Sequence, residues 1–303
     1  MLFGTAILLS AVAVAAPQAQ ERPPRPPQTD QTVPVTRGTR LMVDNQAGEV
    51  VIHTWNQDSV RVMARHSPRM RVNIRPTDAG LVIRASSSNG PSGSVDYDIT
   101  APAWMPMRVE GHYTFVTVDG AQNEVSVKSV RGDIIVKGGT GSVTANSIEG
   151  RITVEGARGK INVSSVNEGI RITGASGEIA AETTNGDISM VRVESASVDV
   201  ASVNGNIVYE GTTADSGRYR LTTHNGDITM IVPETANAIF SVRTYNGEFS
   251  GAGLALKGPP RSEVNRGRRV EYTLGNGSAD VELESFGGAI RLRRAGTTTK
   301  GKN

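Results

Sequence analysis

Four acidic residues recur at one position of a repeated motif and are the first candidates for chemistry. They are Asp133, Asp187, Asp227 and Glu248, each directly after a glycine. Several carboxylate oxygens held together are what Ca²⁺ prefers as ligands. Other copies of the motif carry Arg151, Gly169 and Asn206 at this position, so the row of carboxylates is interrupted. We therefore expect solvated edge charges and predict no metal site.

Two of these acids also raise the question of catalysis on a polysaccharide. Asp187 and Asp227 occupy equivalent copies of the motif and are expected one coil, or ~5 Å, apart. Glycosidase carboxylates can use such a separation. The repeat itself explains both residues, and loops long enough to wall a cleft are missing except over 251–272. We predict no enzyme and no catalytic residue, with a polysaccharide-acting β-helix enzyme as the alternative.

Other motifs that resemble functional sites have simpler explanations. Arg131-Gly132-Asp133 has the sequence of an integrin ligand, but Asn185-Gly186-Asp187 fills the same position of the repeat. The histidines lack a second ligand at zinc-like spacing; they are His53, His66, His112 and His224. The chain has no cysteine, which excludes thiol chemistry and disulfides. We predict no cofactor.

Aromatic residues are the best candidates for contacting a partner. They form an early group and a late group: Trp104, His112, Tyr113 and Phe115, then Tyr219, Tyr245, Phe249 and Tyr272. A row of exposed rings could stack on sugar rings, because aromatic faces are apolar and flat. The alternative for the late group is that it fills a wider core. We take all eight as the candidate surface for an unidentified protein or glycan.

Short strands in a nine-residue repeat must position these residues. Its glycines are Gly132, Gly141, Gly150, Gly159, Gly177 and Gly186. The third and fifth positions are apolar in nearly every rung, as in GDIIVKGGT and GRITVEGAR, which indicates strands with one buried face. The predicted inward positions run in this way from Ile134 to Met190. The eighth position is alternately small and larger, so successive rungs turn two kinds of corner and one coil consists of two rungs.

The regular period predicts an all-β fold, a single-stack right-handed β-solenoid with about 18–21 residues per coil. Asn-Gly pairs between alternating strands are also typical of type I′ hairpins, which would give an antiparallel meander or sandwich. Hairpins do not require a constant repeat length, whereas stacked coils do. The strict grid therefore favours the solenoid.

The corners of the repeat have a structural role in this prediction. We expect the corner glycines to supply a positive φ. The preceding asparagines tolerate the same geometry or stack in an amide ladder; they are Asn185, Asn204, Asn225 and Asn246. Glu168 stands where the grid requires glycine, so we expect a distorted corner there, relieved by Gly169.

The domain organisation follows from composition. Residues 1–16 are apolar and end on small residues, which predicts a signal peptide, with a retained anchor or a buried strand as the alternatives. Residues 17–37 are rich in proline and predict a disordered spacer. The solenoid domain is expected over 38–294, with irregular coils over 38–120, regular repeats over 121–250 and C-terminal coils or a cap over 251–294. Residues 295–303 would be a disordered basic tail, and the mature chain would have no transmembrane segment.

Several segments resemble one bacterial family, the adhesin-like β-strand-repeat domains of unknown function. The resemblance rests on VDNQAGEVVIHTWNQDSVRV near the start, VDYDITAPAWMPMRVE at 95–110, the repeated [ST]-x-N-G-[DN]-I units and the closing FGGAIRLRR. It covers about four fifths of the chain. One segment departs from the family pattern, because HYTFVTVDG at 112–120 replaces an N-G-[DN] unit. The resemblance implies a β-repeat fold and a cell-envelope location, and none of its motifs is catalytic.

Together these features predict a non-catalytic exported module of the cell envelope with a role in adhesion, surface binding or structure. We expect it in the periplasm, on the outer surface or outside the cell. The 32 basic and 30 acidic residues give no reason to expect a nucleic-acid partner. A self-assembling structural protein is the third hypothesis, because terminal coils expose unpaired strands unless they are capped. Residues 60–120 and 251–284 could be such caps.

Overall fold

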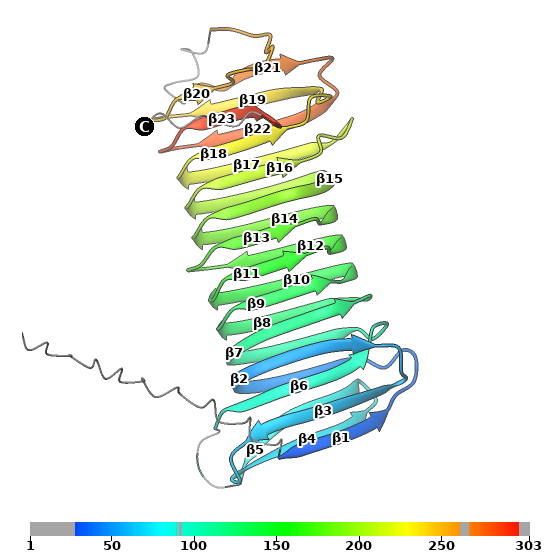
Figure 1. Ribbon diagram of the computed structural model, residues 1–303. Coiled ribbons are helices and arrows are strands. Elements are labelled where there is room, and N and C mark those ends of the chain that lie inside the picture. The colour runs from blue at the N-terminus through cyan, green and yellow to red at the C-terminus, as the bar shows by residue number, and fades with distance from the viewer. Residues whose placement is uncertain (1–27, 89, 91–92, 261–266, 297–303) are drawn as a thin grey trace, which may run out of the picture.

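The protein is a long stack of β-strands (Figure 1). The computed structural model describes residues 28–88, 90, 93–260 and 267–296. All 23 strands belong to one hydrogen-bonded sheet. Among the described residues no helix is long and apolar enough to cross a membrane. The predicted signal peptide, residues 17–27 of the spacer and residues 297–303 of the tail lie outside the described residues.

The central strands form two parallel stacks, and the chain alternates between them. The strands are β7 Met107–Ala121, β8 Val125–Arg131, β9 Ile134–Gly138, β10 Thr140–Glu149, β11 Ile152–Glu155, β12 Arg158–Ser165, β13 Ile170–Thr173, β14 Ser176–Asn185, β15 Ile188–Asn204, β16 Ile207–Gly211, β17 Arg218–Asn225 and β18 Ile228–Val232. Val143 of β10 pairs with Val125 of β8 on one side and with Ile161 of β12 on the other. The odd-numbered partners β9, β11 and β13 stack in the same way. The predicted two-rung coil is confirmed, and every pairing from β7 to β18 is parallel, so the antiparallel meander is wrong for this region.

The core lies between the two stacks. The predicted inward positions from Ile134 to Met190 are each at most 3% exposed. Coils become longer toward the C-terminus: Asn185 bonds a residue 18 positions earlier, whereas Asn225 bonds one 21 positions earlier. Tyr209, Tyr219 and Phe240 fill the core of these longer coils and are at most 1% exposed. The all-β class and the parallel stacking are thus confirmed.

At the N-terminal end the stack does not follow chain order. Its strands are β1 Thr29–Pro34, β2 Leu41–Trp55, β3 Ser59–His66, β4 Met70–Thr77, β5 Gly80–Ser87 and β6 Val95–Pro102. One half of β2 pairs with β5 and β7, and its other half pairs with β6 and β7, so β2 lies inside the stack (Figure 1). The β1–β3, β3–β6 and β4–β5 pairings are antiparallel.

Strand β1 corrects the prediction that residues 17–37 are a disordered spacer. Residues 29–34 pair with β3 instead. Arg61 donates two hydrogen bonds to the Asp30 carboxylate, at 2.9 and 2.8 Å. Pro34 is tolerated because it lies at the end of an edge strand, where a missing N–H breaks no interior ladder.

The C-terminal end has the same inversion of order. Its strands are β19 Ala238–Thr244, β20 Phe249–Ser250, β21 Val270–Leu274, β22 Ala279–Ser285 and β23 Ile290–Arg294. Strand β22 pairs with both β17 and β19, and β23 pairs with both β18 and β20. The last coil of the chain therefore lies inside the stack, where Figure 1 shows the red strands among yellow ones. Strand β21 pairs antiparallel with β19 at the end.

Candidate binding surface

One edge of the stack is formed by repeated five-residue turns that we call the motif corner. They comprise residues 129–133, 147–151, 165–169, 183–187, 202–206, 223–227, 285–289 and 244–248, in the order in which they stack. The first residue of each is a buried serine or threonine. Its hydroxyl donates a hydrogen bond to a carbonyl of the previous coil, as Thr223 does to Gly205 at 2.9 Å. This bond satisfies a carbonyl that the strand ladder leaves free.

The third residue of the turn forms the expected amide ladder. Asn185 donates to the Asn167 side-chain oxygen at 3.1 Å, Asn204 to Asn185 at 2.9 Å, and Asn225 to Asn204 at 2.9 Å. The ladder is confirmed for Asn185, Asn204 and Asn225, and it begins at Asn167, ahead of the asparagines that we had named. Gly287 separates Asn246 from Asn225 in the stack, so Asn246 does not extend the ladder. Because the amides bond one another, this strip of the corner carries no formal charge.

The expected positive φ is found at the grid glycines of the opposite corner, Gly141, Gly159 and Gly177, but the glycine at the fourth position of the motif corner mostly has a different reason. Gly132 has φ +133°, but Gly150, Gly186, Gly205 and Gly226 have no positive φ. A Cβ at Gly205 would lie 1.9 Å from the Gly186 carbonyl oxygen. Close approach of successive coils, rather than backbone conformation, excludes a side chain there. At the Glu168 corner, β12 ends at Ser165, the register partner of Thr183, whereas β14 continues to Asn185. The pairing on either side keeps its register.

The fifth residue of the turn corrects the expected spacing of the acids. Asp187 accepts a hydrogen bond from the Asn206 N–H at 2.7 Å, and Asn206 accepts one from the Asp227 N–H at 2.9 Å. Asp187 and Asp227 are therefore two coils apart, with Asn206 between them. In the part of the chain that the structure describes, no three histidine, aspartate or glutamate side chains are grouped to hold a metal ion.

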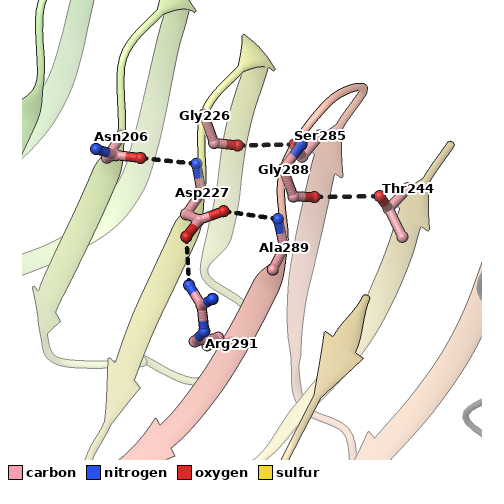
Figure 2. A network of polar contacts seen from close by, with 8 residues as sticks. All are labelled: Asn206, Gly226, Asp227, Thr244, Ser285, Gly288, Ala289 and Arg291. Atoms are coloured by element: carbon pink, nitrogen blue, oxygen red, sulfur yellow. Dashed lines mark hydrogen bonds and ion pairs between the residues drawn. The ribbon is translucent and has the colours of Figure 1, made fainter. Parts of the chain in front are cut away.

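Asp227 joins the inserted last coil to the regular stack (Figure 2). Its carboxylate accepts a hydrogen bond from the Ala289 N–H at 2.7 Å and forms an ion pair with Arg291 at 2.5 Å. The hydrogen bond from Arg291, and then the Ala289 N–H, hold the pKa of Asp227 below its usual value. Ser285 and Thr244 bond the Gly226 and Gly288 carbonyls beside it. The motif corner is thus continuous through the joint, although the chain order is not.

We expect Asp227→Asn to lower the free energy of unfolding at pH 7, and we expect the difference from wild type to disappear in acid. A carboxyl whose folded pKa is depressed stabilises the fold above its unfolded pKa, and this stabilisation disappears as pH falls through the folded value. The side chain is 40% exposed, so the loss should be at most about 1 kcal/mol. Thermal unfolding at pH 7 and below pH 4 measures it. Asp187→Asn, at the equivalent position, is the control, and an equal pH dependence in both variants would contradict the assignment.

The remaining motifs lie within the same framework. Arg131 pairs with Glu149, and Asp133 accepts a hydrogen bond from the Arg151 N–H at 2.8 Å. The Arg-Gly-Asp sequence is therefore part of the repeat. The imidazole of His66 contacts Thr29 and the Ser67 carbonyl, both at 2.9 Å. The His224 ring stacks on Phe286 with 4.7 Å between centroids.

The late aromatic group is mostly core. Tyr219, Tyr272 and Phe249 are 1%, 2% and 7% exposed, so they are not a surface stripe. Each lies at an inward position of its strand. Tyr245 is half-buried at the motif corner, where its ring lies 4.9 Å from Phe286 and beneath the guanidinium of Arg243. The prediction was wrong for three of these four residues.

The early aromatic group divides between two edges of the stack. The Trp104 side chain contacts Arg37 and donates a hydrogen bond to Asp58 at 3.0 Å, away from the motif corner. Its carbonyl accepts a bond from Asn123, which lies on the opposite edge. His112, Tyr113 and Phe115 are exposed where β7 turns the motif corner, while Thr114 points inward. Tyr113 and Phe115 are 58% and 56% exposed and are the most exposed large apolar side chains among the described residues.

The second residue of the turn forms an exposed apolar column that sequence reasoning missed. Residues 111–115 of β7 precede these turns in the stack, so His112 begins the column. We call the column the ridge: His112, Val130, Ile148, Val166, Thr184, Val203, His224, Phe286 and Tyr245, in stacking order. Its valines, isoleucine and phenylalanine are 39–45% exposed. With Tyr113 and Phe115, they account for all the exposed large hydrophobic residues of the described chain. The sequence feature that could have revealed the ridge is the larger residue at the eighth position of every second rung, such as Ile148 and Val166.

The sequence of this domain matches a known family. The model of the Toastrack family, DUF4097, covers residues 39–293. The chain belongs to this family. The expected resemblance to adhesin-like domains is confirmed, because the Toastrack match spans all the segments that carry it except the final residue of the closing FGGAIRLRR.

Two solved structures are similar to this Toastrack chain. One is described as a "putative cell adhesion protein" from Clostridium sporogenes ATCC 15579, with 11% identity and a TM-score of 0.21 over 89% of this chain and 100% of that chain. The other is a "putative adhesin" from Parabacteroides distasonis ATCC 8503, with 10% identity and a TM-score of 0.46 over 87% and 96%. At these values neither carries an argument about function. No curated protein matches the chain.

Proposed function

We propose that this Toastrack protein is a non-catalytic, exported binding module of the cell envelope that contacts a glycan or protein of the cell surface. The observation that carries the proposal is the gathering of every exposed large hydrophobic side chain of the described residues at one edge. Apolar side chains concentrated in this way mark interaction surfaces. The apolar segment at residues 1–16 supports export. We also infer a right-handed β-solenoid, the hand that right-twisted strands favour.

Tyr113 and Phe115 are the side chains that we assign to the partner. They flank the inward Thr114, whose hydroxyl donates to the Asn45 carbonyl at 3.0 Å and fixes the backbone between them. Arg131 lies over the Tyr113 ring at 5.4 Å and holds it in place. Two fixed, exposed rings can stack on sugars or insert into an apolar pocket of a protein at low entropic cost. The three aspartates at the fifth position of the corner, by contrast, accept hydrogen bonds from backbone N–H groups.

Replacing both rings should abolish most of the binding. We expect Tyr113→Ala with Phe115→Ala to weaken binding to envelope fractions or surface glycans by about 10-fold or more, because buried aromatic anchors dominate interfaces. Pull-down and glycan arrays with the purified protein measure this effect. Phe286→Ala, which removes an exposed ring elsewhere on the same edge, should leave binding nearly unchanged. A wild-type protein that binds no envelope fraction, cell or glycan would overturn the proposal.

A further inference from the structure

We infer that the ridge is the contact surface for a second copy of this chain, packed antiparallel and ridge to ridge. The inference goes beyond the proposed function, because it concerns the whole ridge; Tyr113 and Phe115 lie in the end coil of the contact, so a second copy and an envelope partner compete for them. The nine ridge residues are stacked at the strand spacing of ~4.8 Å, so the ridge is ~38 Å long. Its central part, from Val130 to Val203, is aliphatic except for Thr184.

The regular spacing of the ridge side chains favours a second copy of this chain as the binding partner. A surface whose outward side chains, most of them apolar, repeat every ~4.8 Å is complemented along its full length by another surface of the same period. A second copy has that period, and a two-fold axis lets the same ridge serve both partners. The six residues of one turn and its flank span ~20 Å, giving on the order of 800 Å² per copy. That is the area that each partner of a standard-size interface buries.

The strip on one side of the ridge favours self-contact. From Asn167 onward the amide ladder carries no formal charge, and its amides bond one another in pairs. Two copies can therefore approach without bringing like charges together on that side. At the start of the strip, Arg131 and Glu149 neutralise each other.

The strip on the other side of the ridge selects the antiparallel arrangement. Its outward residues, in stacking order, are Glu110, Lys128, Asn146, Ser164, Glu182, Ala201, Thr222, Glu284 and Arg243. With the two-fold axis at Thr184, Lys128 faces Glu284 of the second copy. Glu110 likewise faces Arg243, and these opposite-charge pairs outnumber the one like-charge contact of the strip, which Glu182 makes with its own copy at the axis. In a parallel dimer, this strip of one copy would instead lie beside the amide-ladder strip of the other copy. Lys128 would then lie near Arg131 of the second copy, and this contact between like charges is unfavourable.

The test is the mass of the purified protein in solution. We expect wild type to show twice the mass of one mature chain by light scattering coupled to size exclusion. Val203→Glu should weaken the dimer at least about 100-fold, because it buries two unpaired charges in the contact. Ser197→Glu, on the same strand β15 but outside the ridge, adds the same charge and should remain dimeric. Unchanged circular dichroism would show that both variants fold.

Crosslinking separates the two arrangements. The chain contains no cysteine, so single cysteines can be introduced cleanly. A short bis-maleimide should couple Thr184→Cys at the axis. It should not couple Val130→Cys, whose copies lie six coils, or ~29 Å, apart in the antiparallel dimer. Coupling of Val130→Cys, a wild type that is monomeric at about 100 μM, or a Val203→Glu protein that stays dimeric would each overturn the inference. A monomeric Val203→Glu protein that binds no glycan or envelope fraction would instead count against the proposed function.

Discussion

A chain that ends after Asn276 is expected to lose the cooperative fold of its C-terminal coils. The truncation removes β22 and β23, each of which pairs on both edges. Val281, Leu283, Ile290 and Leu292 are at most 2% exposed. Each buried aliphatic side chain contributes about 1.5–3 kcal/mol, and the sum is comparable with the 5–15 kcal/mol that stabilises a typical domain. The coils on either side would then face a gap with open strand edges, which promote aggregation.

Thermal unfolding and light scattering test this expectation against a matched control. A chain that ends after Gly296 retains both strands and should unfold at the wild-type temperature. In a stack that followed chain order, the same truncation would shorten the rod by one coil and leave the rest intact, because each coil contacts only its neighbours. A monodisperse truncated protein with an unchanged Tm would therefore show that β22 and β23 do not lie inside the stack.

The sequence predicted the local geometry well because that geometry repeats. An 18-residue register and alternating apolar residues determine which side chains from Ile134 to Met190 point inward. The same alternation also places Tyr219 inward, between Arg218 and Arg220 and ahead of Leu221. The prediction of an exposed aromatic row in the late group did not take this alternation into account. The corner residues were recognised as structural, but the reason for glycine, a close approach between coils, needed coordinates.

The order of the coils could not be predicted from the repeat. Ser285 pairs as well beside Thr223 as beside Thr244, since all three residues make the same hydroxyl bond to a neighbouring turn. Equivalent coils are interchangeable in their pairing, so composition does not say which is adjacent to which. The antiparallel pairing of β21 with β19 covers the end and leaves β22 and β23 to enter the stack. The ridge could not be predicted for a related reason. Its side chains form a continuous column only because the corners of successive coils stack on one another.

Gly226→Ala is expected to destabilise the protein strongly, by about 3 kcal/mol or more. A Cβ at Gly226 would lie 2.0 Å from the carbonyl oxygen of Gly205 and 2.5 Å from its carbonyl carbon. Both are backbone atoms, and Gly205 is itself held by its N–H bond to the Asn225 carbonyl at 3.0 Å. The clash can be relieved only by separating two coils, which also lengthens the hydroxyl and amide bonds of the corner.

The expected loss of stability reports the stacking of coils and not the backbone conformation of Gly226. Gly226 has no positive φ, so alanine can adopt its backbone conformation, and such substitutions normally stabilise by about 0.4–1 kcal/mol through the unfolded state. Gly93→Ala provides the matched control, because a Cβ there would meet nothing nearer than Met70 at 3.6 Å. We expect Gly93→Ala to unfold at or slightly above the wild-type denaturant midpoint and Gly226→Ala far below it. Equal midpoints for the two variants would mean that the coils are spaced more widely at this corner, and the close approach of the motif glycines would then not explain why the turn requires them.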